Sequence, residues 1–157
     1  MPRHWRWHDD AVREPRSAVV FDIDGVLADA SWREHFLNNR PKDWDGFFAA
    51  CPRDPVIESG VLALSAVPDD VTLIVLTGRP LKVQRPTIVW FSEHGLRWDL
   101  LIMRPGGQYS ASAVFKGQEF DRLAGSGFEV VGVFDDDRSV IDEARARGLS
   151  ATWVDAR

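Results

Sequence analysis

Five short runs of consecutive apolar residues divide the chain, and between them apolar positions recur at the spacing of a helix. Runs of this length that are rich in β-branched residues are typical of strands buried on both faces of a sheet. The predicted strands are 18–23, 71–76, 99–103, 129–134 and 151–154, and the predicted helices are 57–66, 86–94, 111–124 and 139–147. Gly95 and Gly148 stand where the end of a helix needs a left-handed residue.

This alternation of strands and helices predicts one particular class of fold. Right-handed crossovers connect parallel strands and place helices on both faces of the sheet. We therefore expect a three-layer, Rossmann-like α/β fold with a parallel five-stranded sheet.

Two segments depart from the alternation. Residues 1–17 are polar and aromatic, and we expect an unstructured N-terminal leader before a single domain at 18–157. Residues from about 30 to 55 are too many for a simple crossover loop and carry many aromatic residues. We expect a small helical insertion there, after the first strand, which forms a partial lid over the ligand crevice in the absence of a large cap.

Composition narrows the function only slightly. The 157 residues fit one domain, and 24 acidic against 19 basic residues give a net charge of −5. This balance argues against a broad face that binds duplex DNA, although a local basic patch or a polynucleotide end as substrate remains compatible with it.

The location of the protein is predicted from what the sequence lacks. No apolar run approaches the roughly 20 residues of a membrane-spanning helix, and the first residues lack the apolar core of a secretory signal. We expect a cytoplasmic protein without membrane contact. The single Cys51 excludes an internal disulfide and a cysteine-based zinc cluster, and it is typical of a small buried residue. His4 and His8 have a spacing that metal ligands use, but an unstructured leader is the simpler interpretation.

Polar residues that could bind a ligand or take part in catalysis follow three of the predicted strands. In open parallel sheets, ligands bind beyond the carboxyl ends of the strands. The residues that stand there, with one lysine on the helix before the fourth strand, are Asp22, Asp24, Gly25, Thr77, Gly78, Asp135, Asp136 and Lys116.

These residue types suit phosphoryl transfer. Clustered carboxylates repel one another unless a cation lies among them, and oxygen ligands favour Mg²⁺. Gly25 permits a sharp turn and leaves backbone N–H groups for an anion. Thr77, the N–H of Gly78 and Lys116 are suitable partners for phosphoryl oxygens.

Each residue alone has a simpler interpretation. An Asp at a strand end often caps a helix, a Thr-Gly pair forms an ordinary turn, and a helix lysine is usually solvated. Their occurrence together in one crevice favours the catalytic interpretation. Counting back from Gly148 and the apolar pair Val140–Ile141 assigns Asp135 and Asp136 to the crevice and Asp137 to the helix cap.

The motifs resemble those of the haloacid dehalogenase-like (HAD) phosphatases. The sequence Asp-Ile-Asp-Gly-Val at 22–26 is similar to their first motif, and Leu-Thr-Gly-Arg at 76–79 to their second. Lys116 and the pair Asp135–Asp136 correspond to the third and fourth motifs, in the same order along the chain. The resemblance covers about residues 18–155.

A narrower resemblance concerns the 3′-phosphatase domain of phage polynucleotide kinase and its stand-alone relatives. It rests on Arg79, on Arg-Pro-Thr-Ile-Val-Trp at 85–90, on the Met-Arg pair at 103–104, and on Val-Phe-Lys at 114–116. The chain has no Gly-x-x-x-x-Gly-Lys-Ser/Thr loop, so the resemblance is to the phosphatase half alone. The loop 106–110 also lacks the acidic and basic residues expected there.

The resemblance implies roles for individual residues. Asp22 is the nucleophile that forms a phospho-aspartyl intermediate, and Asp24 is the general acid and base. Mg²⁺ is held by Asp22, the backbone carbonyl of Asp24 and a carboxylate of Asp135 or Asp136. Thr77 and Lys116 complete the catalytic set.

Contacts with the rest of the substrate are less defined. Arg79 and Arg85 suit a second phosphate or a nucleotide, but each is equally compatible with a salt bridge. The aromatic residues of the insertion are suited to stacking on a base, although packing onto the sheet is the simpler role. Trp90 and Trp98 fit core positions.

The sequence therefore predicts a Mg²⁺-dependent phosphomonoesterase that acts on a nucleotide or a phosphorylated polynucleotide end. The alternatives are a HAD phosphatase for a small metabolite, a phospho-accepting signalling module and a catalytically inactive HAD domain that only binds. A receiver-type signalling module would carry its nucleophile after the third strand, and an inactive domain would be expected to lack Asp22 or Asp24.

Overall fold

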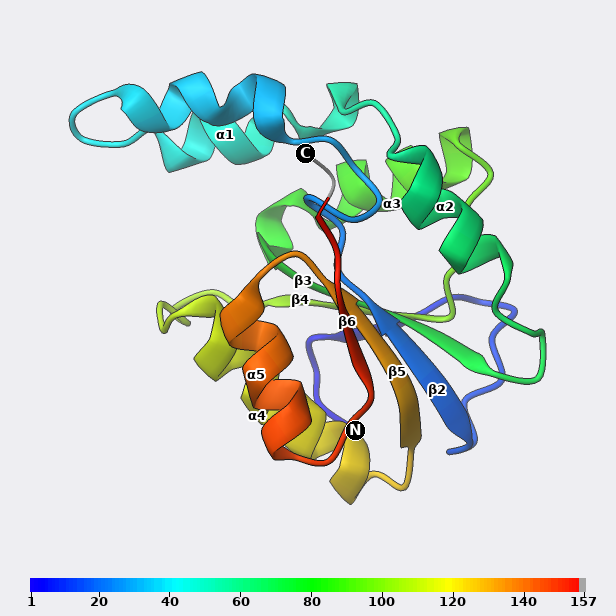
Figure 1. Ribbon diagram of the computed structural model, residues 1–157. Coiled ribbons are helices and arrows are strands. Elements are labelled where there is room, and N and C mark those ends of the chain that lie inside the picture. The colour runs from blue at the N-terminus through cyan, green and yellow to red at the C-terminus, as the bar shows by residue number, and fades with distance from the viewer. Residues whose placement is uncertain (156–157) are drawn as a thin grey trace.

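The computed structural model describes residues 1–155 and contains one six-stranded sheet, in the order β1-β4-β3-β2-β5-β6 (Figure 1). Residues 156–157 of the expected domain lie outside the described residues. The strands are β1 (Trp5–Trp7), β2 (Ser17–Phe21), β3 (Thr72–Pro80), β4 (Leu100–Arg104), β5 (Glu129–Asp135) and β6 (Ala151–Trp153). All five predicted strands are present, within a few residues of their expected bounds.

Strand β2 is central and sets the register of the sheet. Val20 lies opposite Ile74 of β3 and Val133 of β5, and both pairings are parallel. Strands β4 and β6 continue the parallel arrangement on either side. The carboxyl ends of β2 to β6 therefore lie at the same edge of the sheet, where the candidate residues were predicted to meet.

Helices cover both faces of the sheet. The helical segments are η1 (Ser31–Asn38), α1 (Trp44–Ala49), η2 (Cys51–Arg53), α2 (Glu58–Ser65), η3 (Leu81–Val83), α3 (Gln84–Glu93), α4 (Ser112–Gly125) and α5 (Arg138–Ala146), where η denotes a 3₁₀ helix. Alternate residues of the strands form two cores, one with α2 and α3 and one with α4 and α5. Trp90 and Trp98 lie in the first core, as predicted, and Gly95 and Gly148 have the expected positive φ. The three-layer α/β prediction is confirmed.

The prediction of a five-stranded, purely parallel sheet with an unstructured leader is wrong. Residues 5–7 form β1, which pairs antiparallel with the edge of β4. Trp5 and Trp7 alternate with exposed Arg6 and are 7% and 8% exposed, packed against the core under α4. Burying a large apolar side chain contributes about 1.5–3 kcal/mol, and pairing covers an edge that would otherwise be open. His4 adds a contact between this N-terminal segment and α4, since its Nε2 lies 2.5 Å from Oε1 of the buried Glu119.

The insertion after β2 consists of η1, α1 and η2, and it projects over the carboxyl edge of the sheet at the upper left of Figure 1. The predicted helical insertion is therefore present, and its first helix is a 3₁₀ helix. Its last part packs inward, because Cys51 is fully buried and Phe48 rests against the core under α2 and α3. No helix within residues 1–155 has the length and apolar character needed to cross a membrane.

A pair of glycine substitutions tests the packing of α2 against the turn after β2. A Cβ on Gly60 would lie 1.7 Å from the backbone oxygen of Val26, so the helix or the turn must shift. We expect Gly60→Ala to lower the free energy of unfolding by about 1–3 kcal/mol, measured by urea denaturation. The matched control is Gly125→Ala, where no atom lies within 4 Å of the new Cβ, and we expect little change or slight stabilisation. Equal losses in the two variants would contradict this packing.

Candidate active site

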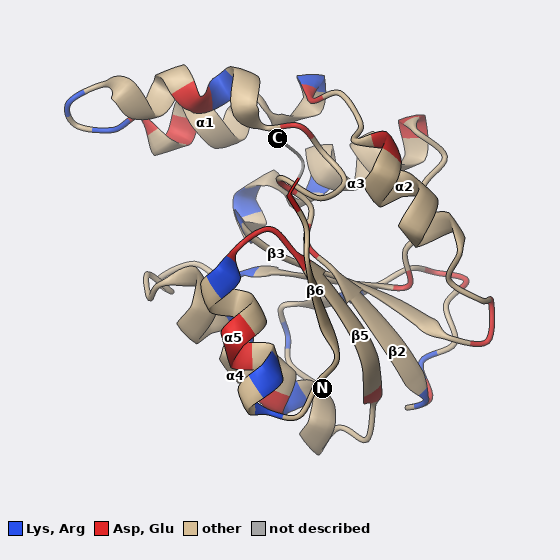
Figure 2. Cartoon of the chain, viewed as in Figure 1, with Lys and Arg blue, Asp and Glu red and all other residues tan. Residues whose placement is uncertain are grey.

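Three carboxylates meet where β2 and β5 end. Asp22 follows β2 directly, Asp135 is the last residue of β5, and Asp136 follows it. One oxygen of each lies within 4.8 Å of the others, which is close enough for a single metal ion to bind all three. Figure 2 shows acidic residues gathered at this end of β5. The structure thus brings together the carboxylates that the sequence placed at two strand ends, and Asp137 caps α5 by accepting from the N–H of Ser139.

Lys116 lies between two of these carboxylates. Its Nζ donates to Asp135 Oδ2 at 2.6 Å and lies 3.0 Å from Asp22 Oδ1. Burial alone lowers the pKa of Lys116, but the two carboxylates outweigh it and raise the pKa well above its ordinary value. The lysine therefore stays charged at neutral pH.

The charges of this group do not cancel. Burial and repulsion by Asp135 raise the pKa of Asp22 well above its ordinary value, against the opposing effect of Lys116. Burial and Asp135 also raise the pKa of Asp136. Three carboxylates against one ammonium leave two negative charges, which is the deficit that one divalent cation would neutralise. An all-oxygen donor set suits Mg²⁺.

Gly25 forms the sharp turn that was expected. Its own N–H donates to the carbonyl of Ala28 at 2.9 Å and is therefore not one of the N–H groups left for an anion. The residue has a φ of 84°, and an added Cβ would lie 2.0 Å from Asp136 Oδ2. Glycine here allows Asp136 to approach the turn that carries Asp22 and Asp24.

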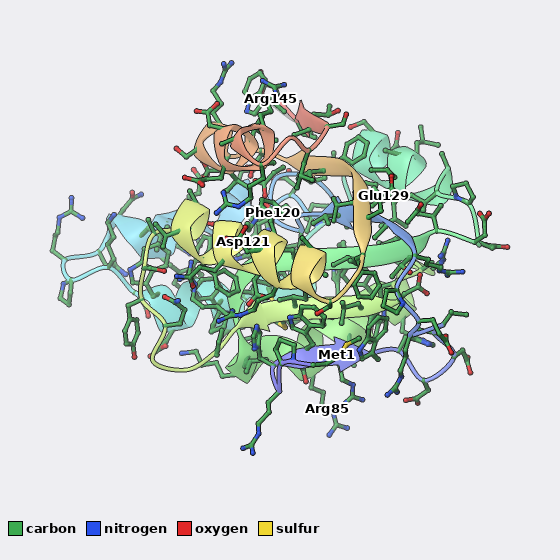
Figure 3. The ribbon with its side chains drawn as sticks, turned by 90° about the horizontal axis from the view of Figure 1, so that it is seen from below. Met1, Arg85, Phe120, Asp121, Glu129 and Arg145 are labelled. Carbon is green, nitrogen blue, oxygen red and sulfur yellow. The ribbon has the colours of Figure 1, made fainter. Side chains whose placement is uncertain are left out.

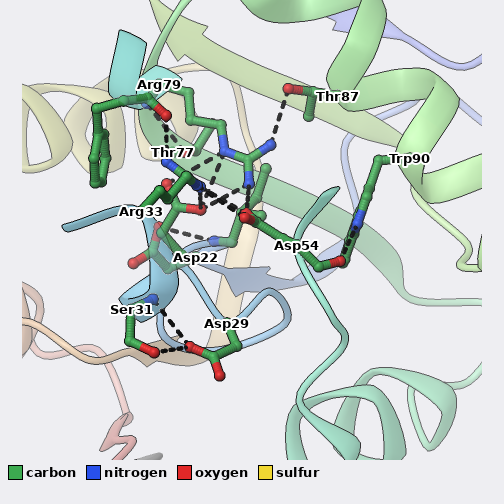
Figure 4. A network of polar contacts seen from close by, with 12 residues as sticks. Asp22, Asp29, Ser31, Arg33, Asp54, Thr77, Arg79, Thr87 and Trp90 are labelled. Atoms are coloured by element: carbon green, nitrogen blue, oxygen red, sulfur yellow. Dashed lines mark hydrogen bonds and ion pairs between the residues drawn. The ribbon is translucent and has the colours of Figure 1, made fainter. Parts of the chain in front are cut away.

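Asp24 belongs to a second charge network, whose members Arg33, Asp54 and Arg79 are labelled in Figure 4. Arg79 Nη2 donates to Asp24 Oδ1 at 2.7 Å, and Arg33 Nη2 donates to the same oxygen at 2.8 Å. Both arginines also donate to Asp54 Oδ2, at 3.2 and 2.6 Å. Two carboxylates face two guanidinium groups, so this network is balanced, and Arg33, Arg79 and Asp54 are all buried.

Arg33 and Asp54 were not found from the sequence. Both lie in the insertion or at its end, where charged residues without periodicity resemble a solvated surface. Asp54 also accepts from Trp32 Nε1, and its backbone oxygen accepts from Trp90 Nε1. Their only sequence signal is their position in the segment that overhangs the carboxyl edge.

The network controls the ionisation of Asp24. Burial raises the pKa of Asp24, but the charges and hydrogen bonds of Arg79 and Arg33 outweigh it, and the pKa falls below its ordinary value. A carboxyl group with a depressed pKa stabilises the fold above its unfolded pKa, and this stability is lost as the pH falls through the folded pKa. Because its pKa is lowered, Asp24 is ionised in the free protein at neutral pH. Its side chain lines the cleft and is 26% exposed.

The remaining predicted residues divide into two groups. Thr77 and Gly78 line the cleft beside Asp22, and Thr77 is 1% exposed. Arg79 also lines it, but its guanidinium is engaged by Asp24, Asp54 and Thr87, which is the salt-bridge alternative considered for it. Arg85 is exposed on α3, points away from the molecule in Figure 3, and does not line the cleft.

The cleft above these residues has a volume of about 1120 Å³ and two unlike walls. One wall belongs to the insertion and contributes Leu37, Trp44, Phe47 and Phe48. The other consists of the end of β4 and the loop 105–111, which connects to α4. Trp44 is 49% exposed and Tyr109 91%, so aromatic surface remains accessible on both sides.

The parallel sheet, the Asp-x-Asp-Gly turn after β2, Thr77 after the next strand, and Lys116 beside Asp135 define a phosphatase of the HAD superfamily. Within it, the model of the polynucleotide kinase (PNKP) phosphatase domain matches residues 16–156. The chain belongs to this family and is a phosphoric monoester hydrolase.

Solved structures support the fold. A chain in the structure of the Pnkp1/Rnl/Hen1 RNA repair complex has a TM-score of 0.72 and 23% identity over 95% of this chain. This chain spans 45% of the length of that one. A HAD-superfamily hydrolase, subfamily IA, from Geobacter sulfurreducens has a TM-score of 0.55 at 14% identity and covers 92% of this chain, which spans 89% of it. Among curated proteins, no significant match is found.

Asp54 allows a test of the buried network. In Asp54→Asn, two buried guanidinium groups face only Asp24, so we expect the free energy of unfolding to fall by about 3–5 kcal/mol in urea at neutral pH. The matched control is Asp45→Asn, whose carboxylate pairs with Lys82 at the surface, and we expect little or no change. A similar decrease in the free energy of unfolding in both variants would show that the buried ion pairs contribute no more to stability than the surface pair.

Proposed function

We propose that this protein is a Mg²⁺-dependent phosphatase that removes the terminal phosphate from a nucleotide or polynucleotide end, with a 3′-phosphate as the expected substrate. The observation that carries the proposal is the group of Asp22, Asp135, Asp136 and Lys116 at the base of a large, partly aromatic cleft. Membership of the polynucleotide kinase phosphatase family supports the substrate class. One structural neighbour belongs to an RNA repair complex, which agrees with this substrate class.

The metal would be held by the carboxylates of Asp22, Asp135 and Asp136. Their mutual distances and the two uncompensated charges fit a divalent cation, and the family resemblance adds the backbone carbonyl of Asp24 as a ligand. When bound, Mg²⁺ offsets the negative charge that the carboxylates and the substrate phosphate share.

Asp22 is the proposed nucleophile. The N–H of Ile23 donates to its Oδ1 at 2.8 Å, and Lys116 Nζ lies 3.0 Å from the same oxygen, so the carboxylate is held in one orientation. A carboxylate oxygen of Asp22 attacks the phosphorus, a phospho-aspartyl bond forms, and the bond to the leaving oxygen breaks. Thr77 and Lys116 are placed to bind the phosphoryl oxygens.

Asp24 is the proposed general acid in the first step and the general base in the second. It protonates the leaving alkoxide, then takes a proton from the water that hydrolyses the phospho-aspartyl group and releases inorganic phosphate. In the free protein Asp24 is ionised, because Arg33 and Arg79 outweigh the effect of burial on its pKa. An arriving phosphate is anionic and raises the pKa of a nearby carboxyl group, which favours the protonated form that the first step needs.

The insertion would form the side of the cleft that receives the nucleoside. Trp44 stacks on Phe48 and meets Phe47 edge-on, which fixes its orientation while about half of it stays exposed. Such a ring is suited to stack on a base. Phe48 packs against the core, which is the simpler of the two roles considered for these aromatic residues, and the exposed part of Trp44 is left for the proposed stacking.

Magnesium should stabilise the folded protein. Because the pKa of Asp22 is raised in the folded metal-free protein, ionisation of this carboxyl group lowers the free energy of unfolding as the pH rises. A bound metal would offset this destabilisation. At a hundredfold excess over its Kd, Mg²⁺ contributes about 2.7 kcal/mol, or roughly 5–10 °C in Tm. We expect a larger shift at neutral than at acidic pH, measured by differential scanning calorimetry.

Asp136→Asn provides the control for this measurement. Removing one of the repelling carboxylates should raise the Tm of the metal-free protein and reduce the shift that Mg²⁺ causes. A wild-type Tm that does not respond to Mg²⁺ at neutral pH would contradict the proposed metal site.

A substrate panel tests the reaction and its substrate class. We expect kcat/KM to be highest for 3′-phosphorylated oligonucleotides, and lower for 5′-phosphorylated oligonucleotides, mononucleotides and sugar phosphates. Asp22→Asn should abolish turnover of every substrate, including an aryl phosphate, with an unchanged circular dichroism spectrum. Residual turnover in this variant would refute the mechanism, and a preference for a sugar phosphate would favour the small-metabolite alternative.

A further inference from the structure

Four basic residues line the cleft, and three of them are neutralised by carboxylates. Arg79 pairs with Asp24 and Asp54, Lys82 with Asp45, and Lys116 with Asp22 and Asp135. The fourth is Arg104, the last residue of β4. Within residues 1–155, no carboxylate lies within ion-pair distance of it.

The guanidinium of Arg104 is nevertheless held in place. Nη1 donates to the carbonyl of Ser110 at 2.8 Å, Nε donates to the carbonyl of Gly78 at 3.4 Å, and Cζ lies 4.9 Å from the ring centre of Phe115. Nη2 makes no hydrogen bond with the described part of the chain. It lies on the Gly78 side, 3.7 Å from where a Cβ on that glycine would stand.

Partial burial of the guanidinium lowers the pKa of Arg104, since no described carboxylate lies close enough to offset the desolvation. A desolvated cation with unused donors favours an anionic ligand. A guanidinium can bind the oxygens of a phosphate through two parallel hydrogen bonds. The chain around it does not repel such a ligand, because the loop 105–111 contains no acidic residue.

The position of Arg104 separates it from the phosphate that is hydrolysed. Neighbouring strands lie about 4.8 Å apart, and β4 is two strands from β2, so their carboxyl ends are about 10 Å apart. Asp22 and Lys116 lie on the β2 and β5 side, whereas Arg104 lies beyond Gly78 on the β4 side. In Figure 1 the loop after β4 projects on the same side of the molecule as the insertion, and residues of both line the cleft.

We propose that Arg104 binds the phosphodiester next to the terminal phosphate that is removed, and so makes the enzyme selective for substrates with a second phosphate. This inference rests on the proposed function, because it assumes a nucleic-acid end as substrate. It assigns a substrate of at least two phosphates, such as a 3′-phosphorylated dinucleotide.

The test compares Arg104→Gln and Arg104→Lys on three substrates: an aryl phosphate, a nucleoside 3′-monophosphate and a 3′-phosphorylated trinucleotide. For Arg104→Gln we expect kcat/KM on the trinucleotide to fall about tenfold to a hundredfold, mainly through KM, the range for one charge-assisted contact. Turnover of the two substrates with a single phosphate should not change. Arg104→Lys should recover part of the loss, because it keeps the charge but not the two-point geometry.

The salt dependence of kcat/KM distinguishes phosphate binding by Arg104 from a purely structural role, which would not change it. For single strands, log affinity falls with log salt with a slope of about −0.7 for each phosphate neutralised. In Arg104→Gln the slope of log kcat/KM for the trinucleotide should become shallower by about 0.7. The matched control is Lys82→Gln, a cleft lysine already paired with Asp45, which should leave kcat/KM and the slope nearly unchanged.

Other outcomes would overturn the inference in distinguishable ways. An equal loss on all three substrates would place Arg104 at the hydrolysed phosphate or in the support of the cleft. No loss on the trinucleotide, or a wild-type enzyme that does not prefer it to the nucleoside monophosphate, would exclude the phosphodiester site while leaving the phosphatase intact. Turnover of the aryl phosphate alone would refute the proposed substrate class and this inference together.

Discussion

Negative charge at the carboxyl edge of the sheet is the constraint around which the rest of the molecule is arranged. Five aspartates meet there, and burying a carboxylate is costly unless a cation accompanies it. The chain separates them into two groups. Asp24 and Asp54 are fully compensated by two arginines, whereas Asp22, Asp135 and Asp136 share a single lysine. The first group is electrically balanced, and the second keeps two uncompensated negative charges that suit a divalent cation.

The compensated group also joins the insertion to the catalytic edge. Arg33 reaches from η1 to Asp24, and Asp54, at the end of the insertion, bridges Arg33 and Arg79. Since the side chains of Arg33 and Asp54 are fully buried, the insertion and Asp24 cannot rearrange independently without exposing or unpairing charge. The wall that would receive the nucleoside is therefore coupled electrostatically to the group that would protonate the leaving oxygen.

Much of this arrangement is predictable from the sequence, and the failures have physical causes. Continuous apolar runs located the strands because a strand buried on both faces tolerates few polar residues, and residues that follow such strands must meet at one edge. Strand β1 was missed because Trp5 and Trp7 alternate with a charged residue, a pattern that in three residues is too short to separate from a leader. Arg33 and Asp54 were missed because ion pairs between distant segments leave no local pattern. Arg85 illustrates the converse, since proximity to a motif in sequence did not bring it to the cleft.

The pairing of β1 with β4 has a consequence at the other end of β4. A chain shortened to begin at Ser17 would leave this strand as a bare, apolar margin of the sheet, which invites association with another molecule. Arg104 terminates the same strand, two to four residues from the positions that β1 covers. Residues 1–16 line no part of the cleft, yet β1 pairs with and stabilises the strand whose last residue would bind the substrate.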